Sequence, residues 1–347
     1  MADIRLTSFA TGGGCARKLA AEDLTQVLKR LGPQSHAWVD PGVGPFEDAA
    51  IVRMPGGRAL AYTVDFITPI VDDPETFGAI AAANALSDVY AMGGEPQVAL
   101  AVCGFPRERI GLEVLEAIFR GGRDKAAEAG CAVAGGHTIQ DAELKYGLCV
   151  IGEVDPGHVL AHPRLCVGDR LVLTKPLGVG VYAQAVKRGA LARAELDELV
   201  RVTTTLNKTA KDAALAARAH AATDVTGFGL LGHLRHLLLG AGLAARVSAA
   251  SVPLMSQARA LVAGGLVPGG SRCNLDYVAP QTRFAPAVSE DDRLLLADAQ
   301  TSGGLLIAVS PSRVEQLCGE LARAGTLAQA VVGEVVSGPA GAIEVRP

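Results

Sequence analysis

Strand-like and helix-like segments alternate along the whole chain, and this alternation limits the possible folds more than any other feature. The first half has strand-like segments at 59–64, 97–103, 131–134 and 146–154, and helix-like segments at 75–92 and 112–129. The second half has strand-like segments at 170–174, 221–223 and 305–309, and helix-like segments at 194–219 and 230–239. Strands mixed with helices in both halves predict two α/β or α+β domains. A stretch with two prolines and two glycines, residues 155–168, predicts the boundary between them.

Composition narrows the class of protein. The chain has 347 residues, of which 49% are hydrophobic and only 4% aromatic, so aliphatic side chains must fill the core. A formal net charge of -4 argues against a general nucleic-acid-binding protein, which would carry a basic face, but it does not exclude one bound nucleotide. No uncharged apolar run approaches the roughly 20 residues of a membrane-spanning helix, and no signal-peptide core follows Met1. The sequence predicts a soluble, cytoplasmic protein that does not bind a membrane.

Cysteine usage predicts a reduced protein. The seven cysteines are scattered singly at positions 15, 103, 131, 149, 166, 273 and 318. An odd number of cysteines without a Cys-x-x-Cys pair suggests neither a disulfide framework nor a zinc site. We interpret the six cysteines after Cys15 as fillers of the core or the surface.

A glycine-rich stretch near the N-terminus, Gly12-Gly13-Gly14-Cys15, combines backbone freedom with a thiol. Arg17 and Lys18 follow, and nearby positive charge lowers the pKa of a cysteine. Three successive glycines are costly to order, so we expect a mobile segment until a ligand binds. The alternatives are a reactive thiol on a lid and a frayed tail with an incidental cysteine. The predicted units are an arm over 1–46, an N-terminal domain over 47–157 and a C-terminal domain over 158–347.

Four aspartates lie in apolar surroundings, where an uncompensated carboxylate is costly to bury. They are Asp48, Asp65, Asp88 and Asp224. Asp65 and Asp224 end strand-like segments, whereas Asp88 lies four residues after Asn84, on the same face of an Ala-rich helix. Oxygen ligands from separate segments suit Mg²⁺, which usually binds together with substrate phosphates. Each aspartate alone is better explained as the cap of a helix or turn, so a metal site requires that they converge.

Glycine-rich loops are predicted after several strand-like segments, at 135–138, 178–180, 227–229 and 301–304. Backbone N–H groups in such loops can hold phosphate. The chain has no P-loop motif, no Gly-x-Gly-x-x-Gly after a strand and no Gly-x-Ser-x-Gly elbow, so an ATP enzyme here would use neither common nucleotide motif. His137, after two glycines, is placed to meet a phosphate. We interpret His233 and His236 as packed or surface histidines rather than as a metal-binding pair.

These residues closely resemble the selenophosphate synthetase (selenide, water dikinase) family over nearly the whole chain. The shared motifs are Gly14-Cys15 with Lys18, Glu47-Asp48-Ala49-Ala50, Asn84-Ala85-Leu86-Ser87-Asp88 and Ala134-Gly135-Gly136-His137. Two further blocks are the most specific, Thr223-Asp224-Val225-Thr226-Gly227-Phe228-Gly229 and Gln300-Thr301-Ser302-Gly303-Gly304.

The resemblance implies a two-domain aminoimidazole-ribonucleotide-synthetase-like fold whose N-terminal domains pair their sheets in a homodimer. It implies the conversion of ATP, selenide and water into selenophosphate, AMP and phosphate, with Mg²⁺ and a monovalent cation such as K⁺. The product would supply selenium for selenocysteine and selenouridine, and a selenium-delivery protein is a further expected partner. By position, Cys15 and Lys18 would be catalytic, and Asp48, Asp88 and Asp224 would bind Mg²⁺. Nucleotide contacts are expected at Lys18, Pro45, Phe46, Glu47, Asp65, Asp88, Gly136, His137 and Thr138.

One departure and two alternatives accompany this interpretation. Some relatives carry a second cysteine where this chain has Arg17, so a mechanism with two thiols on the arm is in doubt here. A thiamine-monophosphate kinase-like or aminoimidazole ribonucleotide synthetase-like enzyme would share the acidic Mg–ATP site, but it would not need the Cys15 arm. A non-catalytic nucleotide-binding scaffold for selenium transfer is the other alternative, and intact Cys15, Lys18 and aspartates argue against it.

Overall fold

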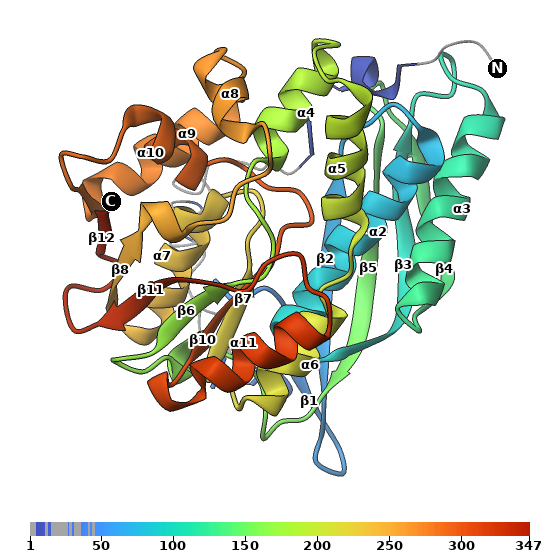
Figure 1. Ribbon diagram of the computed structural model, residues 1–347. Helices are drawn as coiled ribbons and strands as arrows, with labels where there is room; N and C mark the ends of the chain where they lie inside the picture. Colours follow the sequence, from blue (N-terminus) through green and yellow to red (C-terminus); the bar gives the residue numbers. More distant parts are fainter. Residues whose placement is uncertain are drawn as a thin grey trace.

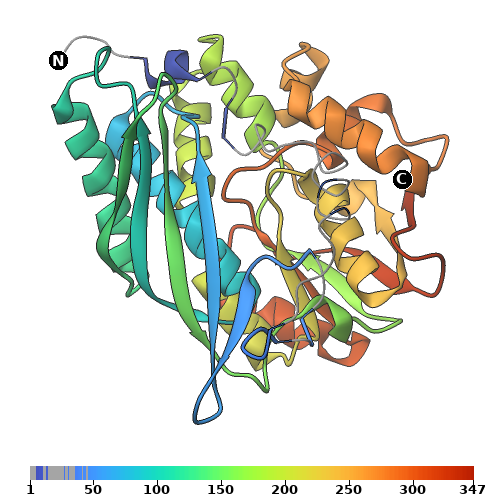
Figure 2. The same cartoon turned by 180° about the vertical axis from the view of Figure 1, so that it is seen from behind.

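Two β-sheets, one in each half of the chain, form the frame of the molecule (Figures 1 and 2). The computed structural model describes residues 5–10, 13–14, 27, 30, 36–40, 42–43 and 46–347. The chain leaves the first sheet at Val154 and enters the second at Arg170. The domain limits proposed above stay a prediction. Over these described ranges, no helix is both long enough and apolar enough to span a membrane.

The first sheet has five strands in the order β1-β2-β5-β3-β4. Their bounds are β1 Ala50–Met54, β2 Arg58–Ile67, β3 Glu95–Phe105, β4 Ala132–Gln140 and β5 Lys145–Val154. Only the β3–β4 pair is parallel. Helices α2 (Pro74–Ala91) and α3 (Leu112–Glu128) cover one face (Figure 1). The opposite face, turned toward the viewer in Figure 2, carries the exposed apolar side chains Tyr62, Val64, Phe66, Leu100 and Ile139.

Helix α2 is buried on almost all sides because its small side chains allow close approach. It begins with Pro74 after Asp73, whose carboxylate accepts a hydrogen bond from the Thr76 N–H and so caps the helix. Glycines bring α2 and α3 into backbone contact: a Cβ on Gly78 would lie 1.9 Å from the Ile118 carbonyl oxygen. Thirteen of its eighteen residues are buried, and the polar Asn84 and Ser87 are among them. Buried polar groups on such a helix need partners, and the second half of the chain supplies some of them.

The second sheet has seven strands in the order β7-β10-β6-β11-β8-β12-β9. Their bounds are β6 Arg170–Leu173, β7 Ala221–Asp224, β8 Ala244–Ser248, β9 Thr282–Phe284, β10 Leu305–Val309, β11 Ala330–Val336 and β12 Ile343–Arg346. Helix α7 (Gly229–Ala241) packs its leucines on one face, while α6 (Lys208–Ala216) and α11 (Val314–Arg323) cover β7, β10 and β6 on the other. The remaining helices are α4 Val179–Lys187, α5 Arg193–Thr204, α8 Ala258–Ala263, α9 Gly269–Val278 and α10 Glu290–Leu296.

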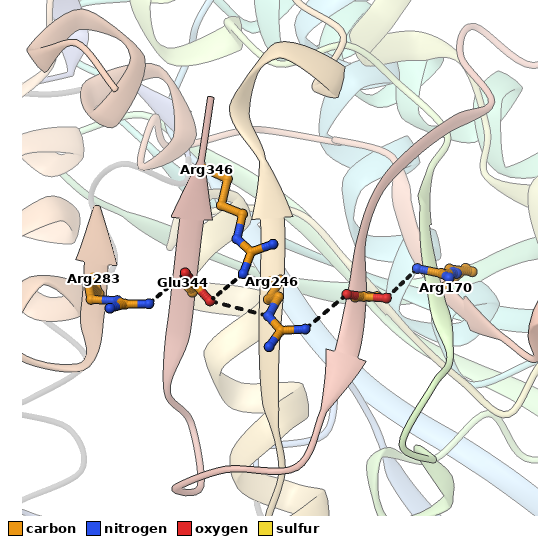
Figure 3. A network of polar contacts seen from close by, with 6 residues as sticks. Arg170, Arg246, Arg283, Glu344 and Arg346 are labelled. Atoms are coloured by element: carbon orange, nitrogen blue, oxygen red, sulfur yellow. Dashed lines mark hydrogen bonds and ion pairs between the residues drawn. The ribbon is translucent and has the colours of Figure 1, made fainter. Parts of the chain in front are cut away.

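A row of alternating charges crosses the second sheet beside α6 and α11 (Figure 3). From β9 to β6 it runs through Arg283, Glu344, Arg246, Glu334 and Arg170, which are cross-strand neighbours. Opposite charges placed directly across a strand pair stabilise the sheet, although partly exposed pairs contribute little each. The row therefore gives a solvent-facing part of the sheet a polar surface.

Two sequence predictions for the first sheet are wrong. The strand predicted at 131–134 does not end before a glycine loop, because β4 continues through Gly135 and Gly136 to Gln140. Strand β3 lies so close that a Cβ on Gly136 would be 2.1 Å from the Ala101 carbonyl oxygen. These glycines therefore permit strand pairing and do not form a phosphate loop. Strand β2 likewise continues past Asp65 to Ile67, which pairs with Tyr146 of β5.

Candidate functional site

Carboxylates from both halves converge where α2 meets the second sheet. Asp48 lies just before β1, Asp88 projects from α2, and Asp224 ends β7. We call these three residues the acidic cluster. The Thr223 hydroxyl donates a hydrogen bond to Asp48 Oδ1 across the contact between the halves, at 3.1 Å. The fold therefore brings together three of the four singled-out aspartates, although Asp224 lies more than 130 positions after the other two.

Asp65 joins the site through Asn84, one helical turn from Asp88. The Asn84 side-chain amide donates to Asp65 Oδ2 at 2.7 Å, and its Oδ1 accepts a hydrogen bond from the Ser302 N–H at 2.7 Å. Asp88 accepts a hydrogen bond from the Thr63 hydroxyl. The polar face of α2 thus meets β2 of its own half and the loop before β10 of the other half.

Burial and the neighbouring charges make the acidic cluster a candidate site for a cation. Burial raises the pKa of Asp48 well above its usual range, and the charges of Asp224, Asp88 and Glu47 raise it further. Asp48 Oδ2 is buried and has no hydrogen-bond partner among the described residues. Carboxylates gathered in this way ionise together only if a cation compensates them. Hard oxygen donors of this kind fit Mg²⁺.

His233 lies beside the acidic cluster. The sequence interpretation did not place this histidine at the site. One of its ring nitrogens is within 4.8 Å of carboxylate oxygens of Asp48 and Asp224. Its Nε2 accepts a hydrogen bond from the Phe228 N–H at 3.3 Å and lies 3.2 Å from the Thr226 hydroxyl. His233 therefore holds the turn that follows Asp224. Its neighbour His236 packs as expected: its ring stacks on the Phe46 ring, with 5.0 Å between the two ring centroids.

The segment before Asp48 is anchored on the second half. Glu47 is buried, and its Oε1 accepts a hydrogen bond from the His162 N–H at 2.9 Å. Burial, aided by the charge of His236, lowers the pKa of His162 to about 3, so its ring is neutral beside the Glu47 carboxylate. Phe46 adopts φ 74°, which directs its ring onto His236. Phe46 and Glu47, both expected nucleotide contacts, thus stand next to the acidic cluster.

Three other expected nucleotide contacts lie away from the acidic cluster. Gly136, His137 and Thr138 belong to β4 at the far edge of the first sheet. Gly136 is aligned with Asp65 through one residue each of β3 and β5, so three strand spacings of about 4.8 Å separate them, roughly 14 Å in total. With Phe119, Arg120, Arg123 and Tyr146, these β4 residues line a cavity of about 530 Å³ beside α3.

The catalytic residues expected on the arm, Cys15 and Lys18, and the expected contact Pro45 lie outside the described residues. The residue directly before Cys15 is described. The Gly14 N–H donates to the Thr68 carbonyl oxygen at 3.2 Å. Gly14 has φ +56°, and a Cβ there would lie 2.1 Å from the Thr301 hydroxyl, so only glycine fits. Gly14 of the arm therefore lies against Thr68 of the first half and Thr301 of the second half.

Lys175 is a second site neighbour that sequence reasoning did not assign a role. Its ammonium group donates to the carbonyl oxygens of Thr205 at 2.6 Å and Ser302 at 2.8 Å. Burial lowers the pKa of Lys175 to about 7, although the nearby charge of Asp224 opposes this shift. Lys175 directly follows a strand-like segment, and a lysine in that position has no distinctive spacing that would reveal a role.

Comparisons with known proteins establish the fold. Residues 46–154 match the family described as AIR synthase related protein, N-terminal domain, and residues 167–346 match its C-terminal domain family. A thiamine-monophosphate kinase structure from Stenotrophomonas maltophilia K279a aligns with a TM-score of 0.64 at 22% identity, covering 95% of this chain and 96% of its own. Hydrogenase maturation protein HypE in complex with ATP aligns with a TM-score of 0.66 at 20% identity, covering 98% and 94%. At these identities the structures show the fold alone, and the predicted two-domain, aminoimidazole-ribonucleotide-synthetase-like α/β fold is confirmed.

Full-length sequence relatives are more specific. A protein from Pelobacter propionicus named selenide, water dikinase is 47% identical over 344 residues, which is 97% of each chain. Another of that name, from Carboxydothermus hydrogenoformans, is 42% identical over 346 residues and covers 100% of both chains. A third, from Myxococcus xanthus, is 44% identical and covers 97% of this chain. The resemblance drawn from the motifs is thereby confirmed, and the chain belongs to the selenide, water dikinase family of AIR synthase-related proteins.

Proposed function

We propose that the protein synthesises selenophosphate from ATP, selenide and water and releases AMP and phosphate. The observation that carries this proposal is the acidic cluster, in which Asp224 and Asp88 lie close enough to Asp48 for their charges to raise the pKa of its carboxylate. Family membership supplies the substrates, because the full-length relatives are named selenide, water dikinase. The product would serve as selenium donor for selenocysteine and selenouridine.

Asp48, Asp88 and Asp224 would hold Mg²⁺, and Asp65 would orient Asn84 beside them. Bound Mg²⁺ would neutralise charge on the ATP phosphates, as metal ions do in phosphoryl transfer. Phe46 and Glu47 adjoin this cluster, which supports their proposed role as nucleotide contacts. A monovalent cation such as K⁺ belongs to the same proposal.

The arm would supply Cys15 and Lys18. The contact of Gly14 with the 301–304 loop supports this placement, because the same loop donates a hydrogen bond to Asn84 beside Asp88. Lys18 would stabilise charge that develops on the transferring phosphoryl group. Selenide is already a strong nucleophile, so Cys15 would receive or orient selenium rather than attack ATP. A reducing cytoplasm would keep this thiol and selenide reduced, and a selenium-delivery protein would bring selenide to it.

A homodimer would account for the distant nucleotide contacts on β4. Within one protomer, three strand spacings separate Gly136 from Asp65 beside the acidic cluster, while the sheet that carries both residues exposes an apolar face. Pairing two such faces would bury this surface. It would also allow the β4 segment of one protomer to serve the nucleotide of its partner.

Phosphorus NMR of the reaction mixture tests the proposal. The wild-type protein should convert ATP into selenophosphate and AMP only when selenide is present. Cys15→Ser and Lys18→Ala should both abolish selenophosphate formation, while Cys15→Ser should still bind Mg–ATP, because a thiol is a poor Mg²⁺ ligand. Arg17→Ala is the matched control on the arm and should be milder, since some relatives carry an uncharged cysteine there. Phosphorylation of thiamine monophosphate, or ATP turnover without selenide, would contradict the proposal.

A further inference from the structure

A second group of potential metal ligands lies at the N-terminal ends of two strands of the seven-stranded sheet, whereas Asp224 of the acidic cluster lies at the C-terminal end of one of them. Strands β6 and β7 both pair antiparallel with β10, so they run parallel to each other and their first residues lie at the same end of the sheet. Cys166 and Asp169 lie just before β6, and His220 lies just before β7. Asp224 follows His220 by four residues along the strand, roughly 13 Å at the usual strand rise. The two sites are therefore separate.

Asp169 organises this group. Its carboxylate is 1% exposed and accepts hydrogen bonds from the Cys166 N–H at 2.9 Å and from His220 Nδ1 at 2.9 Å. The loop between Cys166 and Asp169 is fixed by a hydrogen bond from the Asp169 N–H to the Cys166 carbonyl oxygen, and by pairing of Asp169 with Val335 of β11. This contact holds the carboxylate and the imidazole nitrogen, two groups that both bind metal ions, side by side.

The donor atoms are close enough to share one ion. A carboxylate oxygen of Asp169, a ring nitrogen of His220 and the sulfur of Cys166 all lie within 4.8 Å of one another. Zinc bonds of about 2.3 Å to sulfur and about 2.0–2.2 Å to nitrogen and oxygen put donor atoms roughly 3–4 Å apart, so a small closure suffices. Cys166 is exposed and His220 is half-buried, so an ion can enter from solvent.

We propose that Cys166, Asp169 and His220 bind a zinc-class divalent cation, with water in the fourth position. The thiol proton, which now points to the Arg164 carbonyl oxygen, leaves to solvent when the thiolate binds the metal. The Nδ1 proton that His220 donates to Asp169 exchanges through solvent to Nε2, so that Nδ1 of a neutral imidazole can bind the ion. A sulfur donor with one nitrogen and one oxygen selects Zn²⁺ over Mg²⁺, whereas the oxygen donors of the acidic cluster suit Mg²⁺. The ion joins the loop before β6 to the start of β7. This site does not depend on the proposed selenophosphate chemistry, and it replaces our interpretation of Cys166 as a filler.

Cobalt is the probe that separates this site from others, because a thiolate bound to Co²⁺ gives a charge-transfer absorption band. The full chain carrying Cys15→Ser removes the thiol of the arm, and excess Mg²⁺ occupies the acidic cluster. In this background the band should appear. It should vanish on adding Cys166→Ser and persist on adding Cys273→Ser, which removes an exposed cysteine elsewhere, on α9. The Cys166→Ser variant should also bind Zn²⁺ more weakly than the background protein in competition with Co²⁺. Because a direct ligand is lost, its affinity should fall by more than the roughly 10–100-fold cost of losing an outer-shell partner.

His220→Gln gives a second, independent variant. It should weaken Zn²⁺ binding without removing the thiol, so the cobalt band should need a higher metal concentration. Melting temperatures measured with a chelator should be the same for Cys166→Ser and its parent, because Cys166 is exposed. A background protein without a thiolate band would overturn the proposal, and so would a band that survives Cys166→Ser.

Discussion

At Asp48, both burial and the neighbouring negative charges disfavour the ionised carboxylate. Its carboxylate is buried next to Asp224, Asp88 and Glu47, and the hydrogen bond from Thr223 compensates it only in part. An ionised carboxylate in such a place needs a cation nearby.

Asp88→Asn should weaken binding of Mg–ATP while the fold stays intact, because it removes a charge and almost no volume. Loss of a directly bound carboxylate should reduce affinity by at least about tenfold. Isothermal titration calorimetry with Mg–ATP measures this. Asp124→Asn, at an exposed aspartate of α3, is the matched control and should bind as the wild type does. Equal affinities for the two variants would remove Asp88 from the metal site.

For single residues, the sequence identifies those whose neighbours along the chain already form a distinctive pattern. Asp88 stood out because the helix around it is rich in alanine, and Asp224 because a strand ends there. Lys175 and His233 could not be found in the same way, since their importance depends on Ser302 and Asp48, far away in the chain. The anchoring of Glu47 by His162 spans 115 positions and was equally invisible.

Among the elements, the α2–α3 pair depends on glycine at its crossing. Gly78→Ala should lower the free energy of unfolding by about 1–3 kcal/mol or more, because the new methyl group meets the backbone of Ile118. Gly319→Ala in α11 has open space around its Cβ and should instead add about 0.5–1 kcal/mol. Urea denaturation compares both with the wild type. Equal stability of Gly78→Ala and the wild type would show that the helices can separate at no cost.

A buried carboxylate just after α10, Asp298, packs against the start of α4, and its titration should affect the free energy of unfolding. Asp298 accepts hydrogen bonds from the Gly180 N–H and the Ser271 hydroxyl, yet burial raises the pKa of Asp298 to about 6. An unfolded aspartate has a pKa near 3.9, so the folded state holds the extra proton between these values. The contribution of Asp298 to stability is thus present below about pH 4 and is lost as pH rises through 6.

Comparison with Asp298→Asn measures this dependence. The difference in unfolding free energy between wild type and variant should fall by about 2–3 kcal/mol as pH rises from about 4 to about 6. Asp292→Asn is the control, because hydrogen bonds from Ser289 and Arg259 outweigh burial and lower the pKa of Asp292. Asp292 titrates below about pH 4, so the difference in unfolding free energy between wild type and Asp292→Asn should stay constant from about pH 4 to about pH 6. A constant difference for Asp298→Asn would mean that its carboxylate is ionised throughout.

Element types were predictable where the pattern was long and regular. The segments 75–92 and 112–129 are the helices α2 and α3 to within a residue, and 305–309 is β10. Strands β8, β11 and β12 were missed, because short strands surrounded by loops lack a clear period. Strand β4 was cut short because its glycines have the composition of a turn, and only the neighbouring backbone of β3 explains them.

For the whole molecule, the open apolar face of the first sheet predicts self-association. The wild type should form a dimer at micromolar concentration in multi-angle light scattering, since pairing would bury Tyr62, Val64 and Phe66. Val64→Asp should produce monomers, because it places a charge in that interface. Val331→Asp alters an exposed valine of the other sheet and should leave the mass unchanged. A wild-type monomer would contradict the proposed pairing of sheets.

At the same scale, the sequence predicted two mixed domains but not how they meet. Both halves contained strands and helices, which was enough for the fold class. The contact through Asn207 and Ser87, or through Ser302 and Asn84, joins residues at least 120 positions apart and has no local signature. The placement of Gly136 to Thr138 at a sheet edge required the strand order, which spacing alone does not determine.

The acidic cluster takes Asp48 and Asp88 from one side of this contact and Asp224 from the other, so any cation bound there also acts as a clamp between the halves. Such binding links the folding equilibrium to free metal: above the dissociation constant, each tenfold rise in cation concentration adds about 1.4 kcal/mol to the free energy of unfolding. A chelator should accordingly lower the melting temperature in calorimetry, and Mg²⁺ should restore it. The ionic composition of the surroundings then sets how stably the two halves are held together, even when no substrate is present.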